Sequence, residues 1–406
     1  MCDPAKLALV HRVVLALGAG FLAFFVAGLG RALFATTPDP ALVDTDFSNY
    51  RIAARLTASG EWRDLFGPQP DYFRHMVEAF GADFRWHNWS YPPHTLLLLW
   101  PLSSLGYVPA MAVFLAATGL FYAWAARRFA GEARLLLLAA VFPYAAFMVW
   151  SAQNGFLTAG LALGGLALRQ SRPVAAGILI GLLTIKPQLG LLLPILLLAE
   201  RRYLAIASAA ATTVLLVAVS MAIFGRESWL GYLNHVAPYQ VEVMRTFQGT
   251  FLSMMPTLYG SLRAIGLAAD PALALHLAIG LPVAAAAIAA FFIVPGARWR
   301  AIILSLATPL ATPYAFAYDL GMTAAGLGLM AYLCAADPAS GWRDRWLLAA
   351  AMLAPLATYP LGALGYPVAP VFLAAVFVLA LMRSGFFARC RAFLRQRSIA
   401  PADVRD

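Results

Sequence analysis

A pair of carboxylates lies where the first long apolar run of the chain ends. Asp44 and Asp46 are separated by one residue, in a chain of which only 12% of residues are charged. A positioned carboxylate can act as a general base and take the proton from an attacking hydroxyl group. A polar segment that contains histidine and tryptophan follows as far as residue 90. We therefore expect this segment to carry the chemistry and the rest of the chain to position it.

A lysine interrupts one of the later apolar runs. Lys186 stands in the middle of an apolar stretch from residue 174 to residue 199 and is followed by Pro187, which breaks a helix. An ionisable side chain at membrane depth is costly, which makes it a functional candidate with an anionic partner. That partner would be a phosphate group or a carboxylate such as Asp319. The alternative is an ordinary loop lysine whose amine reaches the membrane surface.

Two other polar points lie at the ends of predicted short helices. One contains Gln153 and Asn154, and the other runs from Thr312 to Asp319 and includes Tyr314. Their polar side chains are candidates for substrate contact, although Gln153 and Asn154 also suit a simple hairpin turn. His87 and His94, which flank a Tyr-Pro-Pro sequence, could hydrogen-bond a phosphate or hydroxyl group, and a structural role is the alternative.

The sequence excludes several kinds of site. Its histidines and glutamates have no metal-site spacing, and it has no glycine-rich nucleotide-binding motif. Cys2, Cys334 and Cys390 are too scattered for a disulfide framework. The net charge of +10 is not organised as a basic stripe interleaved with aromatic residues, so no nucleic acid partner is expected. We expect neither a metal ion nor a cofactor.

The composition predicts an all-α polytopic membrane protein. Hydrophobic residues make up 62% of the chain, and the mean hydropathy is +0.75. A soluble domain is about half apolar and about a quarter charged. Helices are expected because lipid offers no partner for unpaired backbone groups, and the apolar runs lack the period-two alternation of a β-barrel. Residues 13–34 are long enough for a retained first transmembrane helix rather than a cleaved signal.

Arginine clusters between the apolar runs predict the topology, because cytoplasmic loops are rich in basic residues. All clusters fall on one side if residues 91–126 cross an odd number of times, and a two-helix hairpin there is the alternative. The predicted crossings are 13–34, 91–126, 135–150, 155–168, 174–186, 188–199, 203–224, 272–294, 301–312, 320–335, 346–360 and 366–382. This gives about twelve helices, with both termini cytoplasmic and the three polar points on the same outer side as Asp46. Several crossings are short, which would leave a cavity at their tips.

We expect one transmembrane domain over residues 1–406. Its extracytoplasmic catalytic loop would be residues 35–90, with surface helices at 47–59 and 71–80. A second outward loop is expected at 225–271, and a basic cytoplasmic tail at 383–406.

Several short motifs resemble those of glycosyltransferase family 87. The stretch from Asp46 to Ala54 is similar to the first-loop motif of that family. Tyr91-Pro92-Pro93, Gln153-Asn154 and Lys186-Pro187-Gln188 resemble later motifs in the same order. The second half is similar mainly over Pro313–Asp319, where some members carry a histidine that this chain lacks.

The resemblance implies a GT-C-type bundle and an inverting transfer of a mannose-like hexose from a polyprenyl-phosphate donor. Asp46 would be the base, and Lys186 would hold the donor phosphate. Further substrate contacts are expected among Gln188, Gln153, Asn154, His87, His94, Tyr314, Asp319, Tyr50, Arg51 and Asp44.

The implied partners are the lipid-linked donor, a lipid or glycan acceptor and membrane lipids, at the periplasmic face of a bacterial inner membrane. A lipid or solute transporter or flippase is the alternative, because midplane charges beside broken helices also occur in transporters. A polymerase or ligase of lipid-linked glycans is a further alternative function.

Overall fold

A computed structural model describes residues 4–34, 45–81 and 87–399 of the chain. Asp44 is outside these ranges. The described residues form helices and connecting loops without a strand, which agrees with the predicted all-α class. The long helices are α1 (Pro4–Leu33), α6 (Tyr107–Ala130), α7 (Arg134–Ser151), α11 (Tyr203–Gly231), α15 (Ala269–Ile293), α17 (Gly321–Ala336), α18 (Trp342–Ala363) and α19 (Ala369–Arg383).

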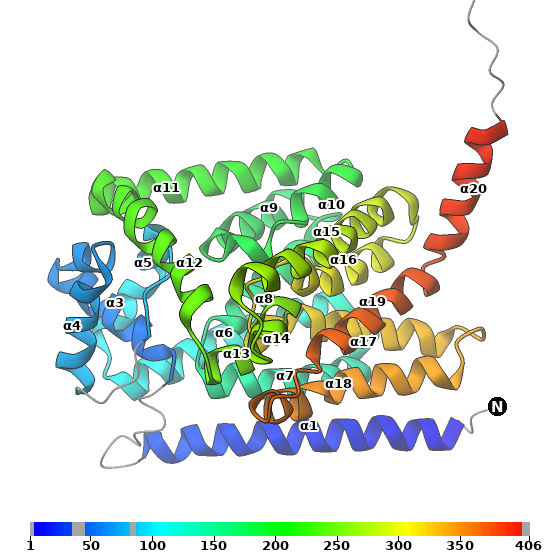
Figure 1. Ribbon diagram of the computed structural model, residues 1–406, viewed down its shortest axis with the longest axis horizontal. Coiled ribbons are helices and arrows are strands. Elements are labelled where there is room, and N and C mark those ends of the chain that lie inside the picture. The colour runs from blue at the N-terminus through cyan, green and yellow to red at the C-terminus, as the bar shows by residue number, and fades with distance from the viewer. Residues whose placement is uncertain (1–3, 35–44, 82–86, 400–406) are drawn as a thin grey trace, which may run out of the picture.

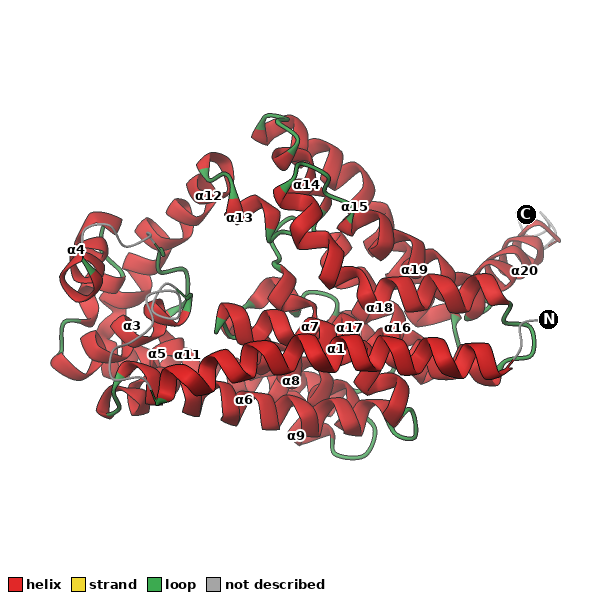
Figure 2. Ribbon diagram, turned by 90° about the horizontal axis from the view of Figure 1, so that it is seen from below, coloured by secondary structure: helices red, strands yellow, loops and turns green. Residues whose placement is uncertain are grey.

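Shorter helices complete the bundle and cover one of its ends. The bundle contains α8 (Gly155–Leu168), α9 (Pro173–Leu182), α10 (Leu193–Ala199) and α16 (Ala297–Ala311). The covering helices are α3 (Phe47–Ser59), α4 (Gln69–Phe80), α5 (Leu96–Leu99), α12 (Ala237–Thr246), α13 (Thr250–Ser253) and α14 (Leu258–Ala264). The basic helix α20 (Phe386–Ile399) bends away after α19. Figures 1 and 2 show α3 and α4 at one end of the bundle, and α20 and the N-terminus at the other.

Each of the twelve predicted crossings coincides with a helix, but the count of twelve membrane spans is not confirmed. Among the described residues, seven helices are long and apolar enough to cross a membrane, or eight if α19 and α20 form one bent span. The 91–126 region contains one such helix, α6. The difference comes from short helices such as α8, whose 14 residues extend about 21 Å, against a hydrocarbon core of roughly 30 Å.

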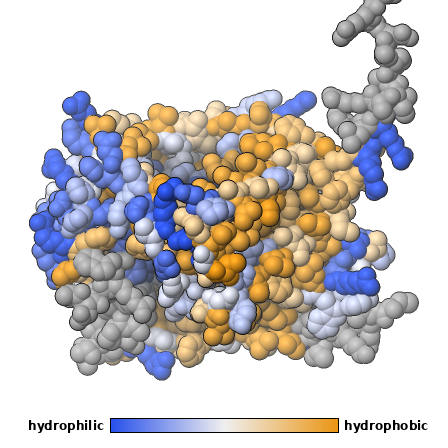
Figure 3. Space-filling view, viewed as in Figure 1, coloured by the Kyte–Doolittle hydropathy of each residue, from blue (hydrophilic) through white to orange (hydrophobic). Residues whose placement is uncertain are grey.

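The arginine clusters lie together at the end of the bundle opposite α3 and α4. Arg169 and Arg300 both donate to the carboxylate of Glu200, at 2.8 Å and 3.0 Å, which joins the C-terminal ends of α8 and α10 to the first turn of α16. Arg383 pairs with Asp344 and so ties the end of α19 to the first turn of α18. Figure 3 shows hydrophilic residues gathered over α3 and α4, whereas apolar residues cover most of the helical body. The bundle thus has the charge asymmetry of an oriented membrane protein.

Helix α3 holds the carboxylate-bearing segment against the protein interior. It spans the predicted residues, and it ends at Gly60, whose φ of 83° suits the left-handed C-cap that glycine favours. Tyr50 and Leu56 are almost fully buried, and so is the polar Ser48. The 3-10 turns η1 (Trp62–Leu65) and η3 (Trp100–Ser104) cover the helix together with α5. Because α3 is enclosed by protein on this side, its N-terminal residue Asp46 has a fixed position.

Candidate functional site

Three helix breaks and the α3 segment meet around one cavity of about 620 Å³. The breaks are the α7–α8 turn, the α9–α10 break and the loop before α17, which correspond to the three polar points of the sequence. Six of the predicted site residues line the cavity, namely Asp46, His87, Gln153, Lys186, Gln188 and Tyr314. Asn154, Asp319 and Tyr50 lie behind this lining, and each is hydrogen-bonded within the network described below. The predicted convergence of these segments is therefore present in the fold.

The α7–α8 turn is shaped by its backbone. Ala152 adopts a left-handed φ of 47° as the C-cap of α7, and Gln153 and Asn154 follow before α8 begins. At Gly155 an added Cβ would lie 2.1 Å from the carbonyl oxygen of Tyr318, so only glycine permits this approach. The turn thus touches the loop before α17, and its amide side chains reach the cavity region.

Lys186 lies in the break between α9 and α10. The helix ends in the 3-10 turn η4 (Leu183–Ile185), and Pro187 begins another, η5 (Pro187–Leu189), so the lysine side chain leaves the helical stack. Its Nζ lies 2.6 Å from Asp319 Oδ1 and 3.4 Å from Asn154 Oδ1. The side chains of Lys186 and Asp319 are 6% and 1% exposed. Lys186 and Asp319 thus form a buried ion pair, which is one of the alternatives predicted for them. Lys186 also lines the cavity.

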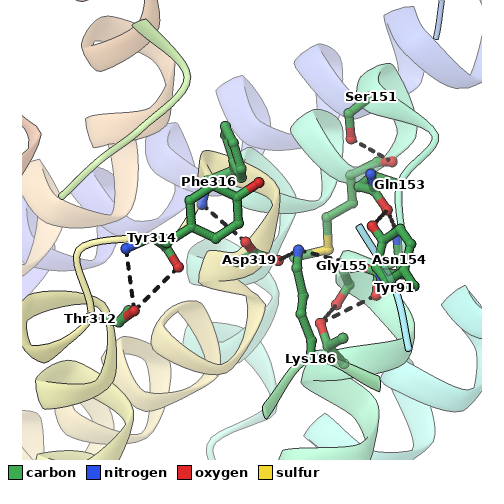
Figure 4. A network of polar contacts seen from close by, with 12 residues as sticks. Tyr91, Ser151, Gln153, Asn154, Gly155, Lys186, Thr312, Tyr314, Phe316 and Asp319 are labelled. Atoms are coloured by element: carbon green, nitrogen blue, oxygen red, sulfur yellow. Dashed lines mark hydrogen bonds and ion pairs between the residues drawn. The ribbon is translucent and has the colours of Figure 1, made fainter. Parts of the chain in front are cut away.

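Hydrogen bonds connect this ion pair to Tyr50 of α3, and Figure 4 shows the part of the network between Asp319 and Tyr91. The hydroxyl of Tyr50 donates to Tyr91 at 2.9 Å, and that of Tyr91 donates to Gln153 Oε1 at 2.8 Å. The same oxygen accepts the backbone N–H of Asn154, at 2.9 Å. Asp319 completes the series, because its Oδ2 accepts the backbone N–H of Phe316 at 3.0 Å. A polar network this well satisfied fixes the relative positions of the segments that carry it.

Asp46 faces the cavity as the N-cap of α3. Its backbone N–H donates to the carbonyl of Ser151 at 3.1 Å, which attaches it to the end of α7. Its Oδ1 lies 2.9 Å from Nδ1 of His87. Asp46 is the one aspartate or glutamate, and Lys186 the one lysine or arginine, among the described residues of the lining. A carboxylate and an ammonium group thus line the same cavity.

Two predicted contact residues point elsewhere. Arg51 donates to the carbonyl of Ser103 at 3.1 Å, and it does not line the cavity. His94 packs away from the cavity, with its ring stacked on Trp229 at a centroid distance of 5.7 Å and its Nε2 3.4 Å from the hydroxyl of Thr184. Arg51 was predicted as a contact because it belongs to the first-loop motif, and His94 because it follows Tyr91-Pro92-Pro93. Neither side chain lines the cavity.

The packing of His94 predicts a pH-dependent stability. Burial lowers the pKa of His94 from 6.5 to about 4, so the folded protein holds this imidazole neutral while the unfolded chain protonates it below about pH 6.5. Stability from this group is fully present above that pH and is lost as the pH falls through 4. We expect a loss of about 3 kcal/mol. Intrinsic tryptophan fluorescence can follow unfolding, and His94→Gln should flatten the pH dependence; an unchanged slope would contradict this.

The wall opposite Asp46 was not assigned from the sequence. Helix α12 and the segment after it contribute Gln240, Met244 and Phe251 to the lining. The side-chain amide of Gln240 donates to the Tyr314 hydroxyl at 2.8 Å, and its oxygen accepts from Asn88 at 3.0 Å. The sequence pointed to this region only through the polar and aromatic residues of the predicted 225–271 loop. It did not show which of their side chains face the cavity. The predicted outward loop is in fact mostly helical and forms part of the site.

The comparison with known families agrees with this geometry. A model of glycosyltransferase family 87 matches residues 89–313, which is more than half of the chain. The chain belongs to glycosyltransferase family 87. It is therefore a membrane glycosyltransferase, and the family membership argues against the transporter alternative. Searches of curated proteins and of solved structures returned no match.

The family match covers only part of the cavity. It includes Tyr91, Gln153 and Lys186, which agrees with three of the motifs that carried the resemblance. Asp46 and Asp319 lie outside the matched range. The family match therefore says nothing about these two residues, and any role proposed for them must be argued from their position in the structure.

Proposed function

We propose that this protein is an inverting glycosyltransferase that moves a neutral, mannose-like hexose from a polyprenyl-phosphate donor to a hydroxyl of a lipid or glycan. The acceptor oxygen attacks the anomeric carbon while its proton passes to Asp46. The bond from that carbon to the phosphate oxygen breaks, and its electron pair leaves with the polyprenyl phosphate. Bond formation and cleavage on opposite faces of the sugar invert the anomeric carbon.

One observation carries this proposal: Asp46 and Lys186 face the same enclosed cavity. The leaving phosphate gains negative charge during transfer, and a fixed ammonium stabilises such charge more effectively in an enclosed site than in water. Lys186 has three N–H donors, and its contacts with Asp319 and Asn154 account for two of them. The ammonium also lies 4.8 Å from the centre of the Tyr318 ring, and we propose that its third N–H donates to a phosphate oxygen when the donor binds. Because Lys186 supplies this charge, we propose that transfer requires no metal ion.

The walls of the cavity suit a lipid-linked sugar. Amide groups such as those of Gln188 and Gln240 provide donors and acceptors for sugar hydroxyls, whereas Val241, Phe247 and Phe251 provide an apolar surface for a polyprenyl chain. The arginine-rich end lies opposite the cavity, and arginine clusters mark the cytoplasmic side. We place the site accordingly at the periplasmic face of a bacterial inner membrane.

The donor class is tested by transfer assays on the purified full-length protein. Radiolabelled hexose is supplied either as a polyprenyl monophosphate ester or as a nucleotide sugar, with a mixed lipid and glycan acceptor extract. Label should enter acceptor products only from the polyprenyl donor, and a chelator should leave the rate unchanged. Transfer from the nucleotide sugar alone would reject the proposal.

A further inference from the structure

The contact between Asp46 and His87 gives the histidine a role different from the predicted phosphate contact. Nδ1 of His87 lies 2.9 Å from Asp46 Oδ1, within hydrogen-bonding distance. The two side chains are 20% and 17% exposed, so the contact lies at the cavity wall and not in open solvent. The Nδ1 edge of the His87 imidazole thus faces the carboxylate of Asp46.

The backbones on both sides of this contact are anchored independently. Asp46 is fixed through its N–H to Ser151, and the residue before it, Thr45, is buried. His87 is followed by Asn88, which bonds to Gln240, and by Trp89, whose side chain is fully buried. The remaining freedom in the pair is rotation of the two side chains. A hydrogen bond between them removes that freedom for the carboxylate.

The orientation of the carboxylate matters because a general base must meet the proton within hydrogen-bonding reach. Lys186 does not orient Asp46, since its ammonium contacts Asp319, Asn154 and the ring of Tyr318. With Nδ1 protonated, His87 donates to Oδ1, which leaves Oδ2 to receive the proton of the acceptor hydroxyl.

We infer that His87 is a positioning residue that holds the Asp46 carboxylate in the orientation needed to receive the acceptor proton. The inference rests on the proposed function. The proton travels from the acceptor hydroxyl to Asp46, and His87 keeps its own Nδ1 proton throughout. His87 acts through Asp46 and contributes no bond to the sugar.

Three substitutions at His87 test whether the position of its hydrogen-bonding N–H group matters independently of the imidazole ring. The side-chain nitrogen of Asn is as many bonds from Cα as Nδ1 of histidine, so His87→Asn can keep the donor to Asp46. The nitrogen of Gln corresponds to Nε2, so His87→Gln offers a donor in the wrong place. His87→Ala offers none. His75→Ala is the matched control, because His75 pairs with Asp64 at 2.7 Å on α4, away from the cavity.

The rate of sugar transfer in each variant should depend on where the side chain at residue 87 places an N–H group relative to Asp46. Misplacement of a reacting group by about 1 Å can cost on the order of 100-fold in rate. We expect kcat to fall by about this factor in His87→Ala and His87→Gln, with donor KM unchanged and with most of the activity retained in His87→Asn and His75→Ala. Equal losses in the Asn, Gln and Ala variants, or a rise in donor KM without a fall in kcat, would overturn the inference.

A second readout does not require turnover. The Tm shifts of His87→Ala and Asp46→Ala are compared with that of the double variant, because residues in contact give non-additive effects. Non-additive shifts support the pairing, and additive shifts overturn it. If the wild-type protein transfers no hexose from the polyprenyl donor but the shifts are non-additive, the proposed donor is wrong and the pairing stands.

Discussion

Replacing Asp46 with Asn is expected to abolish sugar transfer from a polyprenyl-phosphate donor. The amide cannot take up the acceptor proton, and removal of a general base costs about 10² to 10⁴-fold in rate. The fold should persist, because the substitution nearly preserves the shape of the side chain, and the backbone bond to Ser151 remains. The initial rate of transfer by the purified protein measures the effect, with the Tm as the check on folding.

A matched control for Asp46→Asn exists elsewhere in the protein. Asp64 also pairs with a histidine, since its Oδ2 lies 2.7 Å from Nε2 of His75, but it does not line the cavity. Asp64→Asn should therefore leave the rate near that of the wild type. Full activity in Asp46→Asn, or equal losses in the two variants, would contradict the assignment of Asp46 as the base.

Replacing Lys186 with Met is expected to affect both stability and donor binding. The substitution roughly keeps the length of the side chain but leaves the carboxylate of Asp319, which is 1% exposed, without its partner. Removing one member of a buried ion pair costs about 3–5 kcal/mol. Loss of the ammonium should also weaken the hold on the donor phosphate. Thermal unfolding and the donor KM report these two effects separately.

The double variant Lys186→Met with Asp319→Asn distinguishes binding from folding. It removes both buried charges, so much of the lost stability should return. The donor KM should stay raised, because the positive charge that faces the cavity is still absent. A stable double variant with the wild-type donor KM would show that Lys186 serves the fold alone.

Much of the site was predictable because membrane sequences limit where polar residues occur. Lys186 stood out against its apolar surroundings, and its pairing with Asp319 was one of the stated alternatives. The bounds of α3 followed from its amphipathic pattern and from Gly60. The gathering of the helix breaks around one cavity followed from the arginine clusters, since that pattern placed all the breaks on one side.

Other features depend on tertiary geometry that a sequence pattern does not express. The apolar runs predicted the helices correctly and showed that several of them are short, but short helices such as α8 were still counted as membrane crossings. His94 and Arg51 are close in sequence to lining residues, yet their side chains leave the cavity on another face. The bond between His87 and Asp46 joins two segments that are 41 residues apart, and no local pattern reports it.

The most direct test of the central proposal is a cryo-electron microscopy structure of the protein with a non-hydrolysable polyprenyl-phosphate hexose analogue. The phosphate should lie in the cavity within hydrogen-bonding distance of Lys186 Nζ, with the anomeric carbon turned towards Asp46. The polyprenyl chain should follow the apolar wall that includes Phe247 and Phe251. A phosphate bound at the arginine-rich end, or in the cavity without contact to Lys186, would contradict the proposal.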